Sequence, residues 1–183
     1  QHHEEGLEHQ AQMPEVPGPE GLSRNVDLTA ALLDKVPEKM RRFLAHHPPF
    51  EFRPVLAPEF LNPQPREPIK HIWMRAWSEL PDDPALHCNL LTYVSDYELI
   101  GTATLPHALR FDRGQVQIAS LDHAMWFHRP VRVDQWLLYT MDSPRAGCGR
   151  GYSRGQIFTQ AGELVASTAQ EGVIRVWKPS LES

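Results

Sequence analysis

The segment DPALHCNLLTYVSDYELIG, residues 83–101, carries the clearest secondary-structure signal in the chain. Asp83 can cap a helix, and Pro84 suits the first helical position, where its missing N–H group costs no hydrogen bond. Apolar residues then recur at helical spacing and predict a single stripe that faces a core: Leu86, Leu90, Tyr93, Val94 and Tyr97. We therefore expect one long helix that is covered along one side.

Segments rich in aromatic and β-branched residues flank this helix and predict strands. Two precede it, at residues 49–55 and 69–77. Three candidates follow it, namely residues 115–131, residues 135–143, and a hairpin of residues 151–160 and 163–177 that turns at Gln160–Glu163. The simplest packing lays the helix on a strongly bent antiparallel sheet, which is an α+β architecture. Such a sheet has exposed edges, and we expect a partner to protect them.

The N-terminal residues differ in composition from the rest of the chain. Residues 1–24 are polar and contain several prolines and glycines, a composition that buries too little apolar surface to order itself. We expect a flexible interdomain linker at residues 1–24 and one folded domain at residues 25–183. A helix should begin with Asp27 as its cap and should end or kink at Pro37.

Composition excludes several classes of function. The formal net charge of −5 comes without a basic stripe, so nucleic acid is not an expected partner. No apolar run approaches the roughly 18 residues that a membrane span needs. Two cysteines without a C-x-x-C motif fit a reducing compartment. His123 and His128 should face opposite sides of a strand, which argues against one metal site. No phosphate loop of the P-loop or Rossmann type is expected, and we expect no cofactor.

Three residues on different elements could form a site. Asp96 borders the apolar stripe of the long helix, although a solvated carboxylate is the simpler interpretation. Ser120 shares a strand face with Val116 and Ile118, or it simply hydrogen bonds to the backbone. Gln170 shares the strand parity of Leu164, Ala166, Gly172, Ile174 and Val176, and its simpler role is to bridge strands. Together they could hold a water molecule, remove its proton and direct it at a carbonyl carbon.

Four blocks of sequence resemble consecutive blocks of the acyl-CoA thioesterase II family, which includes bacterial and peroxisomal enzymes. They are YVSDYELIGTATLPH (93–107), IASLDHAMWFHRP (118–130), SPRAGCGRGYSRGQIF (143–158) and GELVASTAQEGVIR (162–175). The resemblance runs from about Pro49 to Val176. It implies the second half of a double hot-dog fold, in which a long helix is wrapped by an antiparallel sheet in each of two fused copies.

The resemblance also implies a function and a set of site residues. The catalytic residues of the family correspond to Asp96, Ser120 and Gln170, and the reaction would be hydrolysis of fatty acyl-CoA to free fatty acid and coenzyme A. Acyl-CoA is then the expected substrate partner. A homo-oligomer formed by hot-dog pairing is expected because the first copy is absent, and the chain alone should be weakly active. We expect a cytoplasmic protein, since Leu181-Glu182-Ser183 is not the S-K-L peroxisomal signal.

Two other functions compete with this interpretation. One is a hot-dog enzyme of the enoyl-CoA hydratase kind, in which His123 and Asp122 act as acid and base. The other is a non-catalytic module that binds acyl-CoA or supports assembly. We expect no G-x-S-x-G nucleophile elbow and therefore no serine-nucleophile triad of the α/β-hydrolase type.

Overall fold

The computed structural model of this chain describes residues 6–36, 38, 41, 48–58, 62–110 and 116–177. Its helices are η1 (Pro19–Gly21), α1 (Asn25–Ala30), η2 (Leu33–Lys35), α3 (Pro84–Ser95) and η3 (Ile100–His107). Its strands are β1 (Phe50–Pro54), β2 (Ile69–Ala76), β3 (Val116–Ser120), β4 (Ala124–Phe127), β5 (Leu137–Gly147), β6 (Arg150–Thr159) and β7 (Leu164–Val176).

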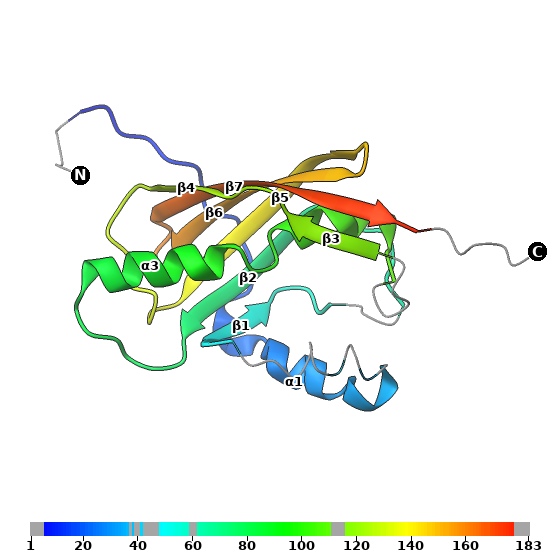
Figure 1. Ribbon diagram of the computed structural model, residues 1–183. Helices are drawn as coiled ribbons and strands as arrows, with labels where there is room; N and C mark the ends of the chain where they lie inside the picture. Colours follow the sequence, from blue (N-terminus) through cyan, green and yellow to red (C-terminus); the bar gives the residue numbers. More distant parts are fainter. Residues whose placement is uncertain are drawn as a thin grey trace, which may run out of the picture.

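Seven strands of the described chain form one sheet in the order β1-β2-β5-β6-β7-β3, and β4 also pairs with β7. Every pairing is antiparallel. Figure 1 shows α3 lying across one face of this twisted sheet. The expected α+β architecture, a long helix on a bent antiparallel sheet, is confirmed.

Local sequence signals account well for α3 and for the last hairpin. The Asp83 carboxylate accepts hydrogen bonds from the backbone N–H groups of Ala85 and Leu86 at 2.9 and 3.4 Å, and Pro84 is the first helical residue. Between β6 and β7, the Gly162 N–H group donates to the Thr159 carbonyl at 3.0 Å, and Gly162 has a φ of 88°. A left-handed conformation of this kind favours glycine at the turn.

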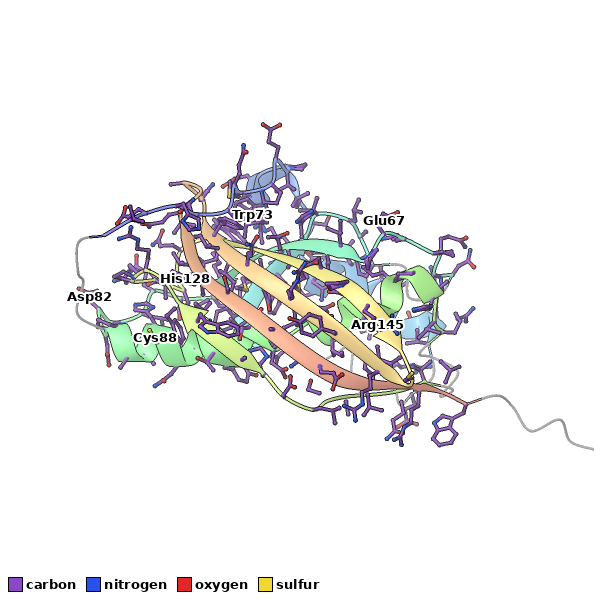
Figure 2. The ribbon with its side chains drawn as sticks, turned by 90° about the horizontal axis from the view of Figure 1, so that it is seen from above. Glu67, Trp73, Asp82, Cys88, His128 and Arg145 are labelled. Atoms are coloured by element: carbon purple, nitrogen blue, oxygen red, sulfur yellow. The ribbon has the colours of Figure 1, made fainter. Side chains whose placement is uncertain are left out.

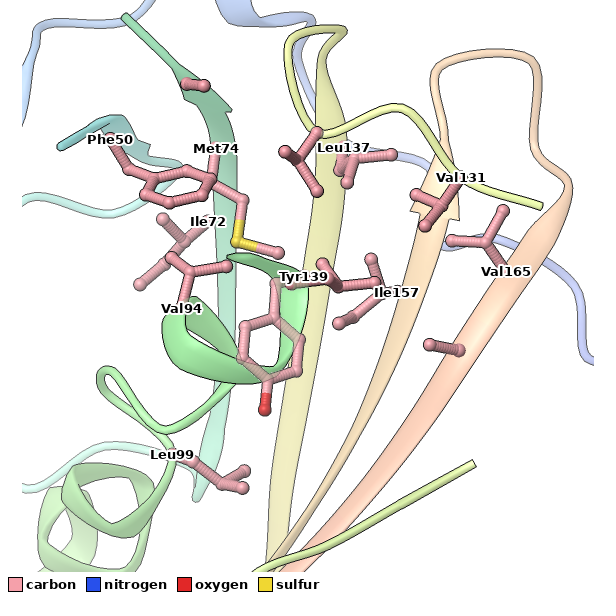
Figure 3. Packing of buried hydrophobic residues seen from close by; sticks show 14 of the residues in the cluster. Phe50, Ile72, Met74, Val94, Leu99, Val131, Leu137, Tyr139, Ile157 and Val165 are labelled. Atoms are coloured by element: carbon pink, nitrogen blue, oxygen red, sulfur yellow. The ribbon is translucent and has the colours of Figure 1, made fainter. Parts of the chain in front are cut away.

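The main core lies between α3 and the sheet, as Figure 3 shows. Leu91 and Val94 of α3 are fully buried there, together with Tyr139 of β5 and Ile157 of β6. Apolar contact of this extent is the main stabilising term of a small domain. It holds the end of α3 firmly against the middle strands.

The buried side of α3 differs from the expected stripe. Tyr93 is 46% exposed, whereas the buried helical residues are His87, Leu91, Val94 and Ser95. Val94 and Leu90 of the expected stripe do pack in the main core, but Tyr93 does not. Leu90 and Leu91 are both apolar, so two overlapping stripes satisfy the helical period. The tyrosine side of α3 instead carries a pair of rings, Tyr93 and Tyr97, whose centroids lie 5.4 Å apart.

A bulge in β7 changes the expected strand parity. Ile157 pairs with Ala166, but the next residue, Phe158, pairs with Leu164, so Val165 is an extra residue. Val165 and Ala166 both join the main core, while Leu164 packs on the opposite face of the sheet. Leu164 therefore does not share the face of Gln170, because a bulge reverses the alternation beyond it.

The N-terminal segment packs on the face of the sheet opposite α3. Trp73, Leu138 and Phe158 form a second buried cluster there, and it is covered by Ala11, Met13, Val16 and Leu22. The Trp73 indole N–H group donates to the Pro17 carbonyl at 2.8 Å, and Figure 2 shows the segment passing beside Trp73. Our expectation that this composition cannot order itself is therefore wrong for residues 11–22, because a few apolar side chains suffice when the sheet supplies the partner surface.

Further contacts hold this segment to the β6–β7 turn and to the edge strand β1. Gln10 donates to the Gly162 carbonyl at 2.7 Å and accepts from the Leu164 N–H group at 3.1 Å. Arg53 donates to the Pro19 carbonyl at 2.7 Å and to the buried Glu51 carboxylate at 2.8 Å. Burial works to raise the pKa of Glu51, but its hydrogen bonds to Arg53 and Arg75 outweigh burial and lower it.

The first helix begins earlier than expected. Its cap is Arg24 rather than Asp27, and Asp27 lies in the first turn, where its carboxylate accepts hydrogen bonds from Arg24 at 2.7 and 2.9 Å. The helix dipole stabilises a carboxylate in the first turn as well as at the cap. Asp27 therefore marks the start of the helix without being its cap residue. Pro37 lies outside the described residues. None of the helices in the described part of the chain has the length and apolar character required to cross a membrane.

Candidate active site

Asp96 ends α3. Its backbone is still helical, with φ −76° and ψ −22°, and its N–H group donates to the Val94 carbonyl. Glu98 then adopts a positive φ of 66°, which turns the chain away from the helix. The Asp96 side chain is 56% exposed, so this carboxylate is held in place by the helix end and remains accessible.

Ser120 and Gln170 approach the same carboxylate from two strands. Ser120 ends β3, and its hydroxyl donates to Asp96 Oδ1 at 3.4 Å. Gln170 lies in β7 with no exposed surface, and its side-chain Nε2 donates to the same Oδ1 atom. The structure thus brings together the three candidates that the sequence placed on separate elements.

A break between β3 and β4 shapes the site. We expected one strand at residues 115–131, but β3 ends at Ser120 opposite Gly172, and β4 begins at Ala124 opposite Ala169. Residues 121–123 therefore face only two residues of β7, which makes a bulge. The Leu121 N–H group donates to the Glu171 carbonyl at 2.9 Å, so the bulge remains attached to β7.

The bulge places His123 inside the site. Its Nδ1 atom lies 3.2 Å from Gln170 Nε2 and 3.9 Å from Asp96 Oδ1, and its Nε2 atom lies 2.8 Å from Ser95 Oγ. The sequence suggested His123 only as an acid–base partner of Asp122. A one-residue bulge has no strong signature in a single sequence, so this position could not be derived from strand alternation.

The hydrogen-bond roles of its neighbours assign a tautomer to His123. An amide NH2 group can only donate, so Gln170 donates to Nδ1, and the ring proton is therefore on Nε2. That proton points at Ser95 Oγ, whose own hydroxyl donates to the Thr92 carbonyl at 2.9 Å.

A buried tyrosine contacts residues next to the site from the sheet side. The Tyr139 hydroxyl donates to the Ser95 carbonyl at 2.8 Å and lies 2.8 Å from Thr168 Oγ1. Burial raises the pKa of Tyr139 far above its ordinary value, so the hydroxyl keeps its proton. Tyr139 thereby connects the last turn of α3 to the centre of the sheet.

Asp122 does not form the acid–base pair that the hydratase alternative requires. Its carboxylate accepts the Glu171 N–H group at 2.7 Å, whereas the His123 ring turns toward Ser95 and Gln170. His128 also lies apart, 2.8 Å from Ser167 Oγ. Among the described residues, no cluster of three or more His, Cys, Asp or Glu side chains could hold a metal ion.

A serine motif that was not among the expected site residues also lies near Gln170. Residues 151–155, GYSRG, have the G-x-S-x-G spacing of a nucleophile elbow. A nucleophile elbow needs an exposed serine on a sharp turn from a strand to a helix. Ser153 instead lies within β6 with no exposed surface, so this serine is not placed as a nucleophile.

The arrangement leaves one carboxylate oxygen available. Both Ser120 and Gln170 donate to Asp96 Oδ1, while Oδ2 has no hydrogen-bond partner within the described part of the chain. An accessible carboxylate oxygen next to a hydroxyl can accept a proton from water.

Comparison with known proteins decides the family. The family model described as acyl-CoA thioesterase matches residues 43–173, which is more than half of the chain. The chain belongs to the acyl-CoA thioesterase family. Within this family it is 39% identical over 182 residues to acyl-coenzyme A thioesterase 8 of Homo sapiens, with 96% of this chain and 56% of that protein covered.

Two bacterial proteins that are similar to this chain are also named as acyl-CoA thioesterases. Acyl-CoA thioesterase 2 of Haemophilus influenzae is 36% identical over 172 residues, with 94% of this chain and 60% of that protein covered. The crystal structure of acyl-CoA thioesterase II TesB2 from Mycobacterium marinum is 39% identical, has a TM-score of 0.70, and is matched over 97% of this chain and 60% of its own length.

The fold is the hot-dog fold expected from the resemblance. A hot-dog protein from Alicyclobacillus acidocaldarius, 19% identical, has a TM-score of 0.66 over 96% of this chain and 59% of that chain. This chain spans little more than half the length of these relatives. That coverage agrees with a resemblance to one half of a double hot dog.

Proposed function

We propose that this chain is the catalytic half of an acyl-CoA thioester hydrolase that releases a free fatty acid and coenzyme A. The observation that carries the proposal is the convergence of Ser120 and Gln170 on Oδ1 of Asp96. Two donors on one oxygen orient the carboxylate and leave Oδ2 to accept a proton. The relatives named as acyl-CoA thioesterases support the substrate class.

In the proposed reaction, a water molecule donates one hydrogen bond to Asp96 Oδ2 and the other to Ser120 Oγ. Asp96 accepts the first proton as the water oxygen attacks the thioester carbon. The tetrahedral intermediate then collapses, the carbon–sulfur bond breaks, and the sulfur leaves as the thiol after taking the proton from Asp96. No covalent acyl-enzyme forms, and no metal or cofactor is required.

The catalytic assignments follow from what each side chain can do. Asp96 is the general base because it is the carboxylate of the cluster and its side chain is accessible. Ser120 orients the water because its hydroxyl proton is directed at Asp96, which leaves its lone pairs for the water. Gln170 is fully buried and holds the carboxylate from the side of the sheet.

We further propose that a second hot-dog copy completes the active protein, and that in its absence the chain forms a homo-oligomer. The sheet ends at β3 and β4, where Leu121 is 51% exposed and Trp126 is 53% exposed. An uncovered strand edge with large apolar side chains recruits another strand. The acyl chain would then bind between the two copies.

We place the protein in the cytoplasm. Cys88 and Cys148 are both free thiols, which suits a reducing compartment. Cell fractionation with an antibody against the chain tests this location. Recovery with peroxisomal or secreted markers would contradict it.

A thiol-release assay tests the function. Purified chain is mixed with saturated acyl-CoA substrates of increasing length, with and without a separately produced first hot-dog half, and Asp96→Asn serves as the inactive control. Release of coenzyme A that requires Asp96 is the expected result. Hydration of an enoyl-CoA without thiol release would establish the hydratase alternative, and binding without turnover in either mixture would establish the non-catalytic module.

A further inference from the structure

Two buried oxygen atoms next to the proposed site lack a hydrogen-bond partner among the described residues. They are Ser153 Oγ and Gln170 Oε1, and both residues have no exposed surface. Ser153 of β6 and Gln170 of β7 are direct partners in the antiparallel register. Directly opposed residues project from the same face of a sheet with Cβ atoms about 4.5–5.5 Å apart. The two side chains are therefore neighbours on one face of the sheet.

The chemistry of the two groups is complementary. A serine hydroxyl rotates freely and can donate, whereas the Oε1 atom of an amide can only accept. Buried polar groups without a protein partner are commonly satisfied by an internal water that makes two or more hydrogen bonds. One water between Ser153 and Gln170 would satisfy both atoms.

The other end of the Gln170 amide is already engaged. Its NH2 group donates to Asp96 Oδ1 and to His123 Nδ1, both of which are acceptors. Rotating the amide by 180° would present Oε1 to the Asp96 carboxylate and to the unprotonated nitrogen of His123. A donor on the Ser153 side opposes that rotation. In the observed orientation it would supply a hydrogen bond to Oε1, and the rotated amide would lose that bond.

Two tightly packed glycines flank Ser153. Gly151 and Gly155 lie on either side of Ser153 on the same face of β6. A Cβ atom on Gly151 would meet Ala103 Cβ at 2.6 Å, and one on Gly155 would meet Tyr139 Cε2 at 2.3 Å. Neither glycine position accommodates a side chain, so Ser153 is the side chain that this stretch of β6 presents on the face of Gln170.

We propose that Ser153 is a positioning residue: through one buried water it holds Oε1 of Gln170 and so keeps the Gln170 NH2 group directed at Asp96. The inference rests on the proposed hydrolase function and adds a residue to it. Ser153 does not touch the substrate. Its effect on the reaction passes entirely through Gln170.

The test compares variants in the thiol-release assay, in whichever mixture the wild-type chain is active. Ser153→Ala should lower kcat roughly tenfold, as expected when a catalytic group loses its orientation, and should leave KM unchanged. Ser153→Thr and Ser153→Val form a matched pair that differ only in the hydroxyl, so Thr should retain more of kcat than Val. This pair decides the question if the alanine variant fails to fold.

Two controls separate positioning from general damage. Ser143→Ala removes another buried serine, whose hydroxyl donates to the Tyr152 carbonyl at 2.6 Å, and should keep kcat. In a Gln170→Ala background, Ser153→Ala should cause no additional loss of residual activity, because residues that act through one another are not additive.

Distinct results overturn the inference and the proposed function. An unchanged kcat in Ser153→Ala, equal activity of the Thr and Val variants, or a full tenfold loss in the Gln170→Ala background would overturn the role of Ser153. Those results would leave the hydrolase intact if Asp96→Asn remains inactive. Absence of thiol release from the wild-type chain in every mixture would instead overturn the proposed function.

Discussion

Ser120 and Gln170 donate to the same oxygen of Asp96, one from the end of β3 and the other from the middle of β7. Because β3 and β7 are neighbouring strands, the sheet determines the spacing of the two donors. The helix end independently determines the position of the carboxylate. A site built in this way depends on the packing of α3 against the sheet.

The Asp96→Asn substitution should lower turnover on the order of 100-fold or more, because it removes the proposed general base. Folding stability should change little, since the side chain is 56% exposed. Thiol release measures turnover, and thermal unfolding measures stability. A folded Asn variant with wild-type turnover would remove Asp96 from the mechanism.

Substitutions at Ser120 should distinguish a hydroxyl that orients water from a nucleophile. Ser120→Thr should retain much of the activity, whereas Ser120→Ala should lose on the order of 10- to 100-fold, as expected when a reacting water is misplaced. Mass spectrometry of a quenched reaction should detect no acyl group on Ser120 or Ser153. A trapped acyl-serine would contradict the water mechanism.

The Gly155→Ala substitution should destabilise the fold by about 1–3 kcal/mol through overpacking. The new Cβ atom would lie 2.3 Å from Tyr139 Cε2 and 2.5 Å from Thr168 Oγ1, so the support beneath Ser95 must shift. Gly21→Ala is the matched control, because no atom lies within 4 Å of its added Cβ. Denaturant unfolding measures both variants, and equal stabilities would show that the core adapts to the methyl group.

The N-terminal segment should contribute to stability. Val16→Asp places a charge against the Trp73 cluster and should cost about 1–3 kcal/mol, with faster proteolysis within residues 6–24. Leu7→Asp is the control, since Leu7 is fully exposed and its substitution should be nearly neutral. If both variants unfold and are digested like the wild type, the packed segment does not contribute to stability.

The chain alone should self-associate and hydrolyse acyl-CoA poorly. Light scattering across a dilution series should show a concentration-dependent dimer, and Trp126→Lys should weaken it by placing a charge at the β4 edge. Leu56→Lys, a 68% exposed position beyond the opposite edge strand β1, should have no effect. A stable monomer with full activity would contradict both the proposed pairing of hot-dog copies and the role of the first copy.

The sequence by itself determined the features that depend on neighbours in the chain. Asp83 and Pro84 determine the start of α3, Gly162 marks the last hairpin, and alternating residues identify the long strands, because capping and turn geometry are local. The resemblance to the thioesterase II family selected Asp96, Ser120 and Gln170 as candidates. Spacing alone is equally compatible with their simpler individual roles.

Only the tertiary structure decided how these parts meet. The bulge at residues 121–123 brings His123 to Gln170, and the bulge at Val165 moves Leu164 to the other face, because strand register depends on the partner strand. The buried side of α3 was decided by its fit to the sheet. The packing of residues 11–22 likewise depends on an apolar surface assembled from β2, β5 and β6, which are remote from the segment in the sequence.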